Sequence, residues 1–151
     1  MSGAPRLTSG LVATLGFLAA VGPFATDMYL ASFTEIAADL GSSASAVQLT
    51  LTAFLLGIGA GQLLLGPLSD RFGRRPVMVL SMGVFALSSV LMVFTPTIEV
   101  FVALRLVQGV AGAAGIVVAR AIAVDLSEGE TAVRALSLIA TVTALGPLVA
   151  P

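Results

Sequence analysis

Long apolar stretches, separated by short polar segments, dominate this sequence. Five of them cover residues 7–30, 47–68, 77–94, 100–119 and 135–151. Each reaches or approaches the roughly 20 residues with which a helix crosses a hydrocarbon layer of about 30 Å. Because a bilayer offers no water to backbone N–H and C=O groups, these stretches are predicted to be helices. The predicted fold class is therefore all-α, a polytopic membrane helical bundle.

The composition narrows the range of functions. Of the 151 residues, 58% are hydrophobic and only 10% are charged, with a net charge of -1. Soluble domains carry about a quarter charged residues, and a nucleic-acid-binding surface needs a basic excess. The chain has no cysteine and no histidine, so the commonest metal ligands and a thiolate nucleophile are missing. We therefore expect no metal, no cofactor, no nucleic-acid partner and no enzymatic activity.

The arginines predict the orientation of the bundle in the bilayer. One side of it carries six of the seven arginines, namely Arg6, Arg71, Arg74, Arg75, Arg120 and Arg134. No basic residue occurs in the opposite connections, whose acidic residues are Glu35, Asp39 and Glu99. Short loops rich in Lys and Arg stay on the cytoplasmic side. We expect a multi-pass protein of the inner (plasma) membrane with its N-terminus in the cytoplasm.

The last apolar stretch is incomplete. It ends at Pro151 after about 17 residues, which is short of a full crossing. An odd number of spans with an unfinished last one indicates the N-terminal part of a larger transmembrane domain. We expect the C-terminal half of that protein to be absent from this chain.

Glycines and prolines interrupt the predicted helices at particular places. Gly57 and Gly61 form a small-xxx-small pair that lets another helix approach closely. Pro23 in the first span and Gly146-Pro147 in the fifth remove backbone hydrogen bonds. We expect both helices to bend there, as hinges of a moving protein or as ordinary membrane-helix kinks.

The connection between the second and third spans is rich in turn-forming and charged residues. It reads Gly66-Pro-Leu-Ser-Asp70-Arg71-Phe-Gly73-Arg74-Arg75-Pro76. Gly66 suits close helix approach, Gly73 a turn with positive φ, and Pro76 the first turn of a helix. An aspartate among three arginines can pair locally or face a helix N-terminus, and so latch a cytoplasmic gate. The alternative is a plain basic anchor.

Two ionisable side chains lie inside predicted spans. Asp27 is about 6 Å inside the end of the first span, and Arg105 is about 9 Å inside the same side of the fourth. Charges at this depth are costly and are functional candidates by default. We expect the two to pair, with Asp27 as the proton or cation site and Arg105 as its electrostatic partner. The alternative is an Asp27 that reaches water at the membrane surface.

Polar and aromatic side chains near these charges are candidates for a substrate cavity. Gln62 and Gln108 lie at membrane depth, where they line a cavity or bond across helices. Phe24 and Tyr29 face an apolar cargo or, alternatively, lipid and the interface.

Three motifs resemble those of one transporter family. The run Gly66-x-x-x-Asp70-Arg71-x-Gly73-Arg74-Arg75 matches all six positions of the loop 2-3 signature of the major facilitator superfamily. Arg105-Leu-Val-Gln108-Gly109 is similar to the RxxQG pattern of its fourth span, which adds Gly109 to the cavity candidates. The sequence from Gly146-Pro147 to Pro151 is similar to the start of its antiporter motif, which makes Pro151 a further hinge candidate.

The first span narrows the resemblance to a subfamily. Gly22-Pro-Phe-Ala-Thr-Asp27-Met-Tyr29-Leu is similar to the signature of the Bcr/CflA group of drug:proton antiporters, although Ala31 replaces the proline expected next. The resemblance implies twelve spans in two halves, of which this chain holds about five. It also implies a small-molecule substrate, protons as the coupling ion, and lipid as the solvent.

The predicted function is secondary active transport. The resemblance implies proton-coupled efflux of small apolar or amphipathic compounds, of the multidrug type, by alternating access. Uptake of a sugar or metabolite by the same fold is the first alternative, since importers share the loop 2-3 signature. A non-transporting structural membrane protein is the alternative of another class.

Overall fold

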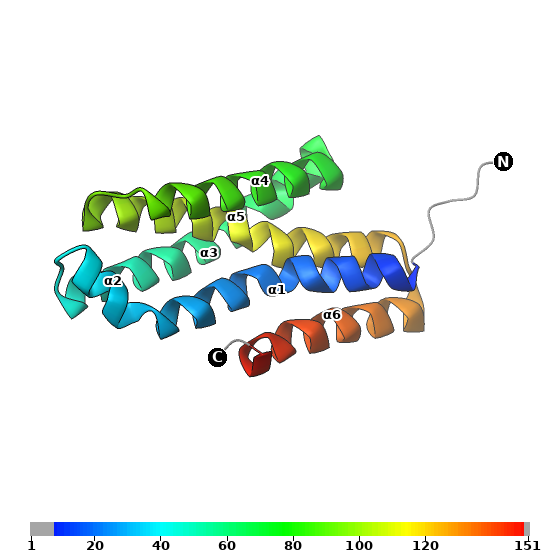
Figure 1. Ribbon diagram of the computed structural model, residues 1–151. Helices are drawn as coiled ribbons and strands as arrows, with labels where there is room; N and C mark the ends of the chain where they lie inside the picture. Colours follow the sequence, from blue (N-terminus) through cyan, green and yellow to red (C-terminus); the bar gives the residue numbers. More distant parts are fainter. Residues whose placement is uncertain (1–7, 150–151) are drawn as a thin grey trace.

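The computed structural model describes residues 8–149, with the backbone alone for residues 146–149. Over this range the chain forms six helices and no strand (Figure 1). They are α1 (Ser9–Ala31), α2 (Phe33–Asp39), α3 (Ala44–Phe72), α4 (Arg74–Val93), α5 (Ile98–Asp125) and α6 (Gly129–Val149). The predicted all-α class is confirmed.

Local side chains and one glycine determine where the helices begin and end. The Thr8 hydroxyl accepts a hydrogen bond from the Leu11 N–H and caps α1, and Ser43 caps α3 in the same way. Both satisfy amide groups that have no partner inside the first turn of a helix. Gly73 separates α3 from α4 with φ of 95°, a backbone conformation that suits glycine alone. The predicted positive-φ turn at Gly73 is confirmed.

Helix α5 lies at the centre of the bundle (Figure 1). It packs against α3 most extensively, then against α4 and α1, while α6 packs mainly along α1. The contact between α3 and α5 requires glycine. A Cβ atom at Gly57 would collide with the Leu106 carbonyl oxygen, and one at Gly61 would lie 2.5 Å from the Val110 carbonyl oxygen. The predicted close approach through Gly57 and Gly61 is therefore present, and it is made with α5.

The buried apolar side chains form two clusters at different positions along the bundle. The larger one joins Leu15 of α1, Val118 of α5 and Ile139 of α6. The smaller one, built on Tyr29, Val47 and Phe101, lies where α2 packs over the ends of α1 and α3. Below, the end of the bundle that holds α2 is called the α2 end, and the opposite end is called the Gly73 end.

The five long helices overlap the five predicted spans, and α3 and α5 extend beyond theirs at both ends. Four of them, α1, α3, α4 and α5, are long and apolar enough to cross a membrane over the described residues. The fifth predicted span is α6, which is not among the four. Helix α2 lies in a segment for which the sequence predicted only a connection.

One expectation about the connection between the second and third spans is wrong. The residues from Gly66 to Phe72 do not form a loop, because α3 continues through them as regular helix. Gly73 alone lies between α3 and α4. Close approach at Gly66 is also not required, since a Cβ there would lie 3.7 Å from the nearest side chain. Pro76 lies in the first turn of α4, as predicted.

The structure describes the two predicted proline hinges to different extents. Helix α1 continues from Ser9 to Ala31 through Pro23, so the proline does not end it. Gly146 and Pro147 lie within α6, in the segment described by its backbone alone. Pro151 lies outside the described residues, as does Arg6. A hinge role for these positions stays a prediction.

Candidate functional site

Arg105 is buried in a box of aromatic rings at the α2 end. Its side chain comes from the second turn of α5 and the residue is 7% exposed. The guanidinium carbon lies 3.7 Å from the centroid of the Tyr29 ring. The rings of Phe54 and Phe101 both lie 5.6 Å from the same carbon. A desolvated cation over an aromatic face is attracted by the negative potential of the ring, which offsets part of the cost of burial.

A chain of hydrogen bonds extends from Arg105 to α4. An Arg105 terminal nitrogen donates to the Gln108 amide oxygen at 3.0 Å. The Gln108 amide nitrogen donates to the Ser89 hydroxyl at 2.7 Å. Ser89 in turn donates to the backbone carbonyl oxygen of Phe85 at 2.9 Å. All three hydrogen bonds run in the same direction, from Arg105 to Phe85, because arginine offers only donors and the Phe85 carbonyl only accepts.

The Tyr29 ring is held by α3. Its hydroxyl forms a short hydrogen bond with the Thr50 hydroxyl. Thr50, which is fully buried, donates to the Val47 carbonyl oxygen at 2.6 Å. Tyr29 itself is 4% exposed. The aromatic face over which Arg105 lies is therefore fixed between α1 and α3.

A cavity of about 690 Å³ opens beside this network at the α2 end. Arg105, Gln108 and Ser89 supply polar groups to its lining, and Tyr29, Phe101 and Met92 supply apolar surface. A cleft with an apolar wall and a few convergent polar groups is the usual form of a small-molecule site. Two of the predicted cavity residues, Tyr29 and Gln108, line it.

The other predicted cavity residues lie elsewhere. Gly109 belongs to the contact between α5 and α3, where a Cβ atom would collide with the Phe54 carbonyl oxygen. Gln62 is exposed on α3, and Phe24 is half-buried on α1. None of these three lines the cavity at the α2 end.

Asp27 and Arg105 do not form the expected ion pair. The two ion pairs of the part of the chain that the structure describes both involve Arg74. Asp27 is half-buried, and its Oδ2 atom is buried without a hydrogen-bond partner. Two residues along a helix correspond to a rotation of about 200°. Because Tyr29 faces Arg105, Asp27 points to another side of α1.

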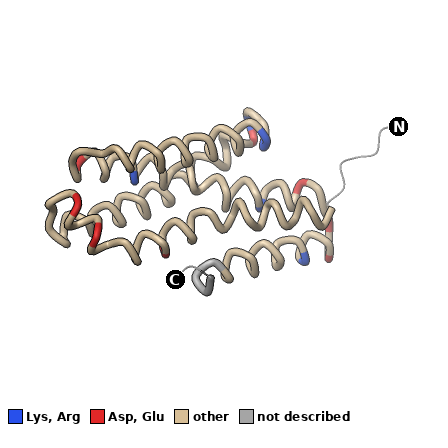
Figure 2. Tube along the Cα trace, in the orientation of Figure 1, with Lys and Arg blue, Asp and Glu red and all other residues tan. Residues whose placement is uncertain are grey.

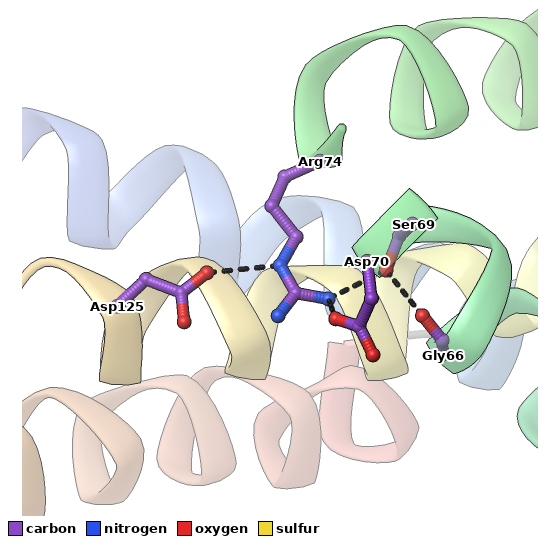
Figure 3. Close-up of polar contacts among 5 residues, drawn as sticks. All are labelled: Gly66, Ser69, Asp70, Arg74 and Asp125. Atoms are coloured by element: carbon purple, nitrogen blue, oxygen red, sulfur yellow. Dashed lines mark hydrogen bonds and ion pairs between the residues drawn. The ribbon is translucent and has the colours of Figure 1, made fainter. Parts of the chain in front are cut away.

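A second polar cluster lies at the Gly73 end (Figure 3). An Arg74 terminal nitrogen lies 2.5 Å from an Asp70 carboxylate oxygen and donates to the Ser69 hydroxyl at 2.6 Å. Its Nε atom donates to Asp125, the last residue of α5, at 2.9 Å. Ser69 donates to the Gly66 carbonyl oxygen at 2.8 Å. One arginine therefore joins the ends of α3, α4 and α5.

The other two arginines of this motif differ from Arg74. Arg71 and Arg75 are exposed, and the Arg71 guanidinium lies over the Phe72 ring at 5.3 Å. In the backbone trace of Figure 2, basic positions of this region lie at the Gly73 end together with acidic ones, whereas α2 and the start of α5 at the opposite end carry acidic positions. Arg71 and Arg75 are thus available to solvent or lipid headgroups, while Arg74 joins the helices.

The sequence analysis did not identify several members of the two polar networks around Arg105 and Arg74. Asp125 was not among the predicted site residues, but it ends α5 and pairs with Arg74. Ser69 occupies an unspecified position of the loop 2-3 signature, so the motif did not single it out. Nothing in the sequence distinguished Ser89 from Ser88, or Thr50 from the other threonines.

Comparison with known proteins decides the family. The model of the Major Facilitator Superfamily matches residues 15–151. The chain belongs to the major facilitator superfamily. An uncharacterized MFS-type transporter, YdgK, of Bacillus subtilis is 48% identical over 91% of this chain. A bicyclomycin resistance protein homolog of Haemophilus influenzae is 44% identical over 93% of it, and multidrug resistance protein D of Escherichia coli is 38% identical over 93%.

The similarity to proteins named for bicyclomycin and multidrug resistance supports the Bcr/CflA-type resemblance of the first span. The match covers only 34% to 36% of the relatives' own lengths. The chain thus spans about a third of the length of the curated relatives that it matches. Membership of a transporter family and four apolar, membrane-length helices make the protein a multi-pass membrane protein.

Proposed function

We propose that this chain is the N-terminal part of a proton-coupled exporter of small apolar or amphipathic compounds. The observation that carries the proposal is the buried Arg105 beside a cavity, with an unpartnered Asp27 on the adjacent helix. Buried charge inside a membrane bundle is costly and is retained where it serves substrate or ion movement. The names of two relatives, which refer to bicyclomycin and multidrug resistance, favour efflux.

Asp27 is the proposed proton site. It is the only acidic residue inside the predicted spans, and histidine is absent from the chain. The Asp27 Oδ2 atom is buried and has no hydrogen-bond partner among the described residues, so no described group occupies this oxygen. Alternating access would change the separation between Asp27 and Arg105. Cargo in the cavity beside Arg105 would then compete with Asp27 for the guanidinium, which couples cargo to protons.

The cluster on Arg74 is the proposed gate. It joins the ends of three helices through exposed or half-exposed side chains. Such contacts are individually weak, so they can break and reform during a transport cycle. The proposed gating segment comprises Gly66, Asp70, Arg71, Gly73, Arg74 and Arg75. We add Ser69 and Asp125 to it because both accept hydrogen bonds from Arg74.

We further propose that the Gly73 end faces the cytoplasm of the cell. Arg71, Arg74, Arg75, Arg120 and Arg134 all lie toward that end, and the short segments at the α2 end carry no basic residue. This distribution follows the positive-inside rule for a protein of the inner membrane. The remaining two thirds of the relatives' length would supply the second half of the bundle.

Replacement of Asp27 tests the proposal. Cells expressing the full-length protein should tolerate more bicyclomycin than cells without it, and Asp27→Asn should abolish this gain at equal expression. The control is Glu35→Gln, which neutralises an exposed carboxylate at the α2 end and should leave resistance unchanged. Unchanged resistance in Asp27→Asn would refute the proton role. Resistance that is lower with the protein than without it would favour uptake, the alternative within the fold.

A further inference from the structure

The orientation of the Gln108 amide is determined by its two neighbours. Arg105 offers only N–H donors, so Gln108 must present its carbonyl oxygen to the guanidinium. Its NH2 group then faces the Ser89 hydroxyl, whose own proton is directed to the Phe85 carbonyl. Ser89 therefore acts as an acceptor for Gln108. Each member of this chain is oriented by the next one, and the chain ends on the backbone of α4.

The ring side of Arg105 is restrained in the same way. Tyr29 places its face 3.7 Å from the guanidinium carbon, and its hydroxyl is tied to Thr50 on α3. The guanidinium thus contacts Gln108, which is held by Ser89 on α4, and Tyr29, which is held by Thr50 on α3. After these contacts are made, Arg105 Nε remains buried without a hydrogen-bond partner among the described residues.

We propose that Ser89 and Tyr29 are positioning residues that hold Arg105 in place, Ser89 through Gln108 and Tyr29 through its ring. Their restraint keeps the guanidinium at the cavity wall and away from an ion pair with Asp27. Without the Ser89 hydroxyl, the Gln108 NH2 group loses its acceptor on α4, and the Gln108 side chain is free to move. The guanidinium, which donates to the Gln108 oxygen, would then shift with it.

The consequence for transport rests on the proposed function, whereas the restraint itself does not. Arg105 and Ser89 both line the cavity, so a displaced guanidinium changes how cargo binds. We expect a higher KM with a similar maximal rate. A merely structural role of Ser89 would instead lower the amount of folded protein.

Arginine side-chain NMR spectra of the full-length protein in lipid nanodiscs test the restraint. Protons over the face of an aromatic ring are shielded, so the Arg105 signals should be displaced from those of exposed arginines. They are identified by their loss in Arg105→Lys. Ser89→Ala should move them, and Ser89→Thr, which keeps the hydroxyl, should restore them. Unmoved Arg105 signals in Ser89→Ala would overturn the proposal.

Ser88→Ala is the matched control. Ser88 precedes Ser89 on α4, is 3% exposed, and takes no part in the chain from Arg105 to Phe85. The Arg105 signals should stay in place in this variant. An equal displacement in Ser88→Ala and Ser89→Ala would assign the effect to packing and would overturn the proposal.

Transport kinetics provide the second measurement. With labelled bicyclomycin and everted membrane vesicles, Ser89→Ala should raise KM about fivefold, as expected for the loss of one hydrogen bond between uncharged side chains. In a Gln108→Ala background, Ser89→Ala should have no further effect, since Ser89 acts through Gln108. If Ser89→Ala raised KM by the same factor in the Gln108→Ala background, Ser89 would not act through Gln108, and the proposal for Ser89 would be overturned. If the unmodified protein moves no bicyclomycin, the proposed function fails for this compound while the NMR result still decides the restraint.

Discussion

The guanidinium of Arg105 lies over the ring of Tyr29, 3.7 Å from its centroid, and not against the carboxylate of Asp27. The two candidate partners are two residues apart on α1, so they face different sides of that helix. A buried arginine therefore rests on an aromatic face while a buried carboxyl oxygen stays unpartnered. Among the described residues, neither the Asp27 carboxylate nor the Arg105 guanidinium therefore takes part in an ion pair.

The contribution of the Tyr29 ring is testable by replacing it with an aliphatic side chain. Tyr29→Leu removes the aromatic face, and a desolvated cation–π contact is worth about 2 kcal/mol. Tyr29→Phe keeps the face and loses only the hydroxyl contact with Thr50, which is worth about 1 kcal/mol. We expect the thermal midpoint of the full-length protein in detergent to fall more in Tyr29→Leu. Equal midpoints for the two variants would show that the ring face does not stabilise Arg105.

The cluster at the Gly73 end should matter more for transport than for stability. Exposed ion pairs contribute about 0.2–1 kcal/mol, and Asp125 keeps 49% of its side-chain surface exposed. Asp125→Asn should therefore lower the thermal midpoint only slightly. If the cluster couples the ends of three helices, transport should fall about fivefold or more. Glu128→Gln, a nearby exposed substitution, is the control, and transport that stays normal in Asp125→Asn would exclude a gate at this site.

The contact between α3 and α5 depends on a glycine at position 109. In Gly109→Ala the new Cβ would collide with the Phe54 carbonyl oxygen and would lie 3.1 Å from the Cα of Gly57. We expect a loss of about 1–3 kcal/mol in the free energy of unfolding, as for other overpacked interfaces. Gly83→Ala on α4 meets nothing within 4 Å and should be neutral or stabilising. Equal stability of the two variants would contradict the close packing.

The proposed orientation is open to labelling because the 151 residues contain no cysteine. Single cysteines are introduced as Ser42→Cys at the α2 end and Glu130→Cys at the Gly73 end, with any cysteine elsewhere in the full-length protein replaced. A membrane-impermeant maleimide added to intact spheroplasts should label the first site. The second should react only after permeabilisation. The reverse pattern would place the N-terminus outside the cytoplasm.

Much of the candidate site was visible in the sequence because each motif has its own spacing. Arg105 and Gln108 are three residues apart on one helix, so their hydrogen bond follows from helix geometry. Asp70 and Arg74 are four residues apart and pair across Gly73. Asp125 and Ser89 were missed because their partners lie 51 and 19 residues away in the sequence. No local pattern specifies such contacts.

The sequence by itself determined that the chain is a bundle of membrane-length helices, since apolar length and backbone hydrogen bonding leave no other choice in a bilayer. It also determined that the chain turns at Gly73, because this residue adopts a backbone conformation that other residues avoid. Only the tertiary structure decided that Arg105 lies on Tyr29 and not beside Asp27. The rotation of α1 about its axis determines whether Tyr29 or Asp27 faces Arg105. Packing of α1 against α3 and α5 fixes this rotation.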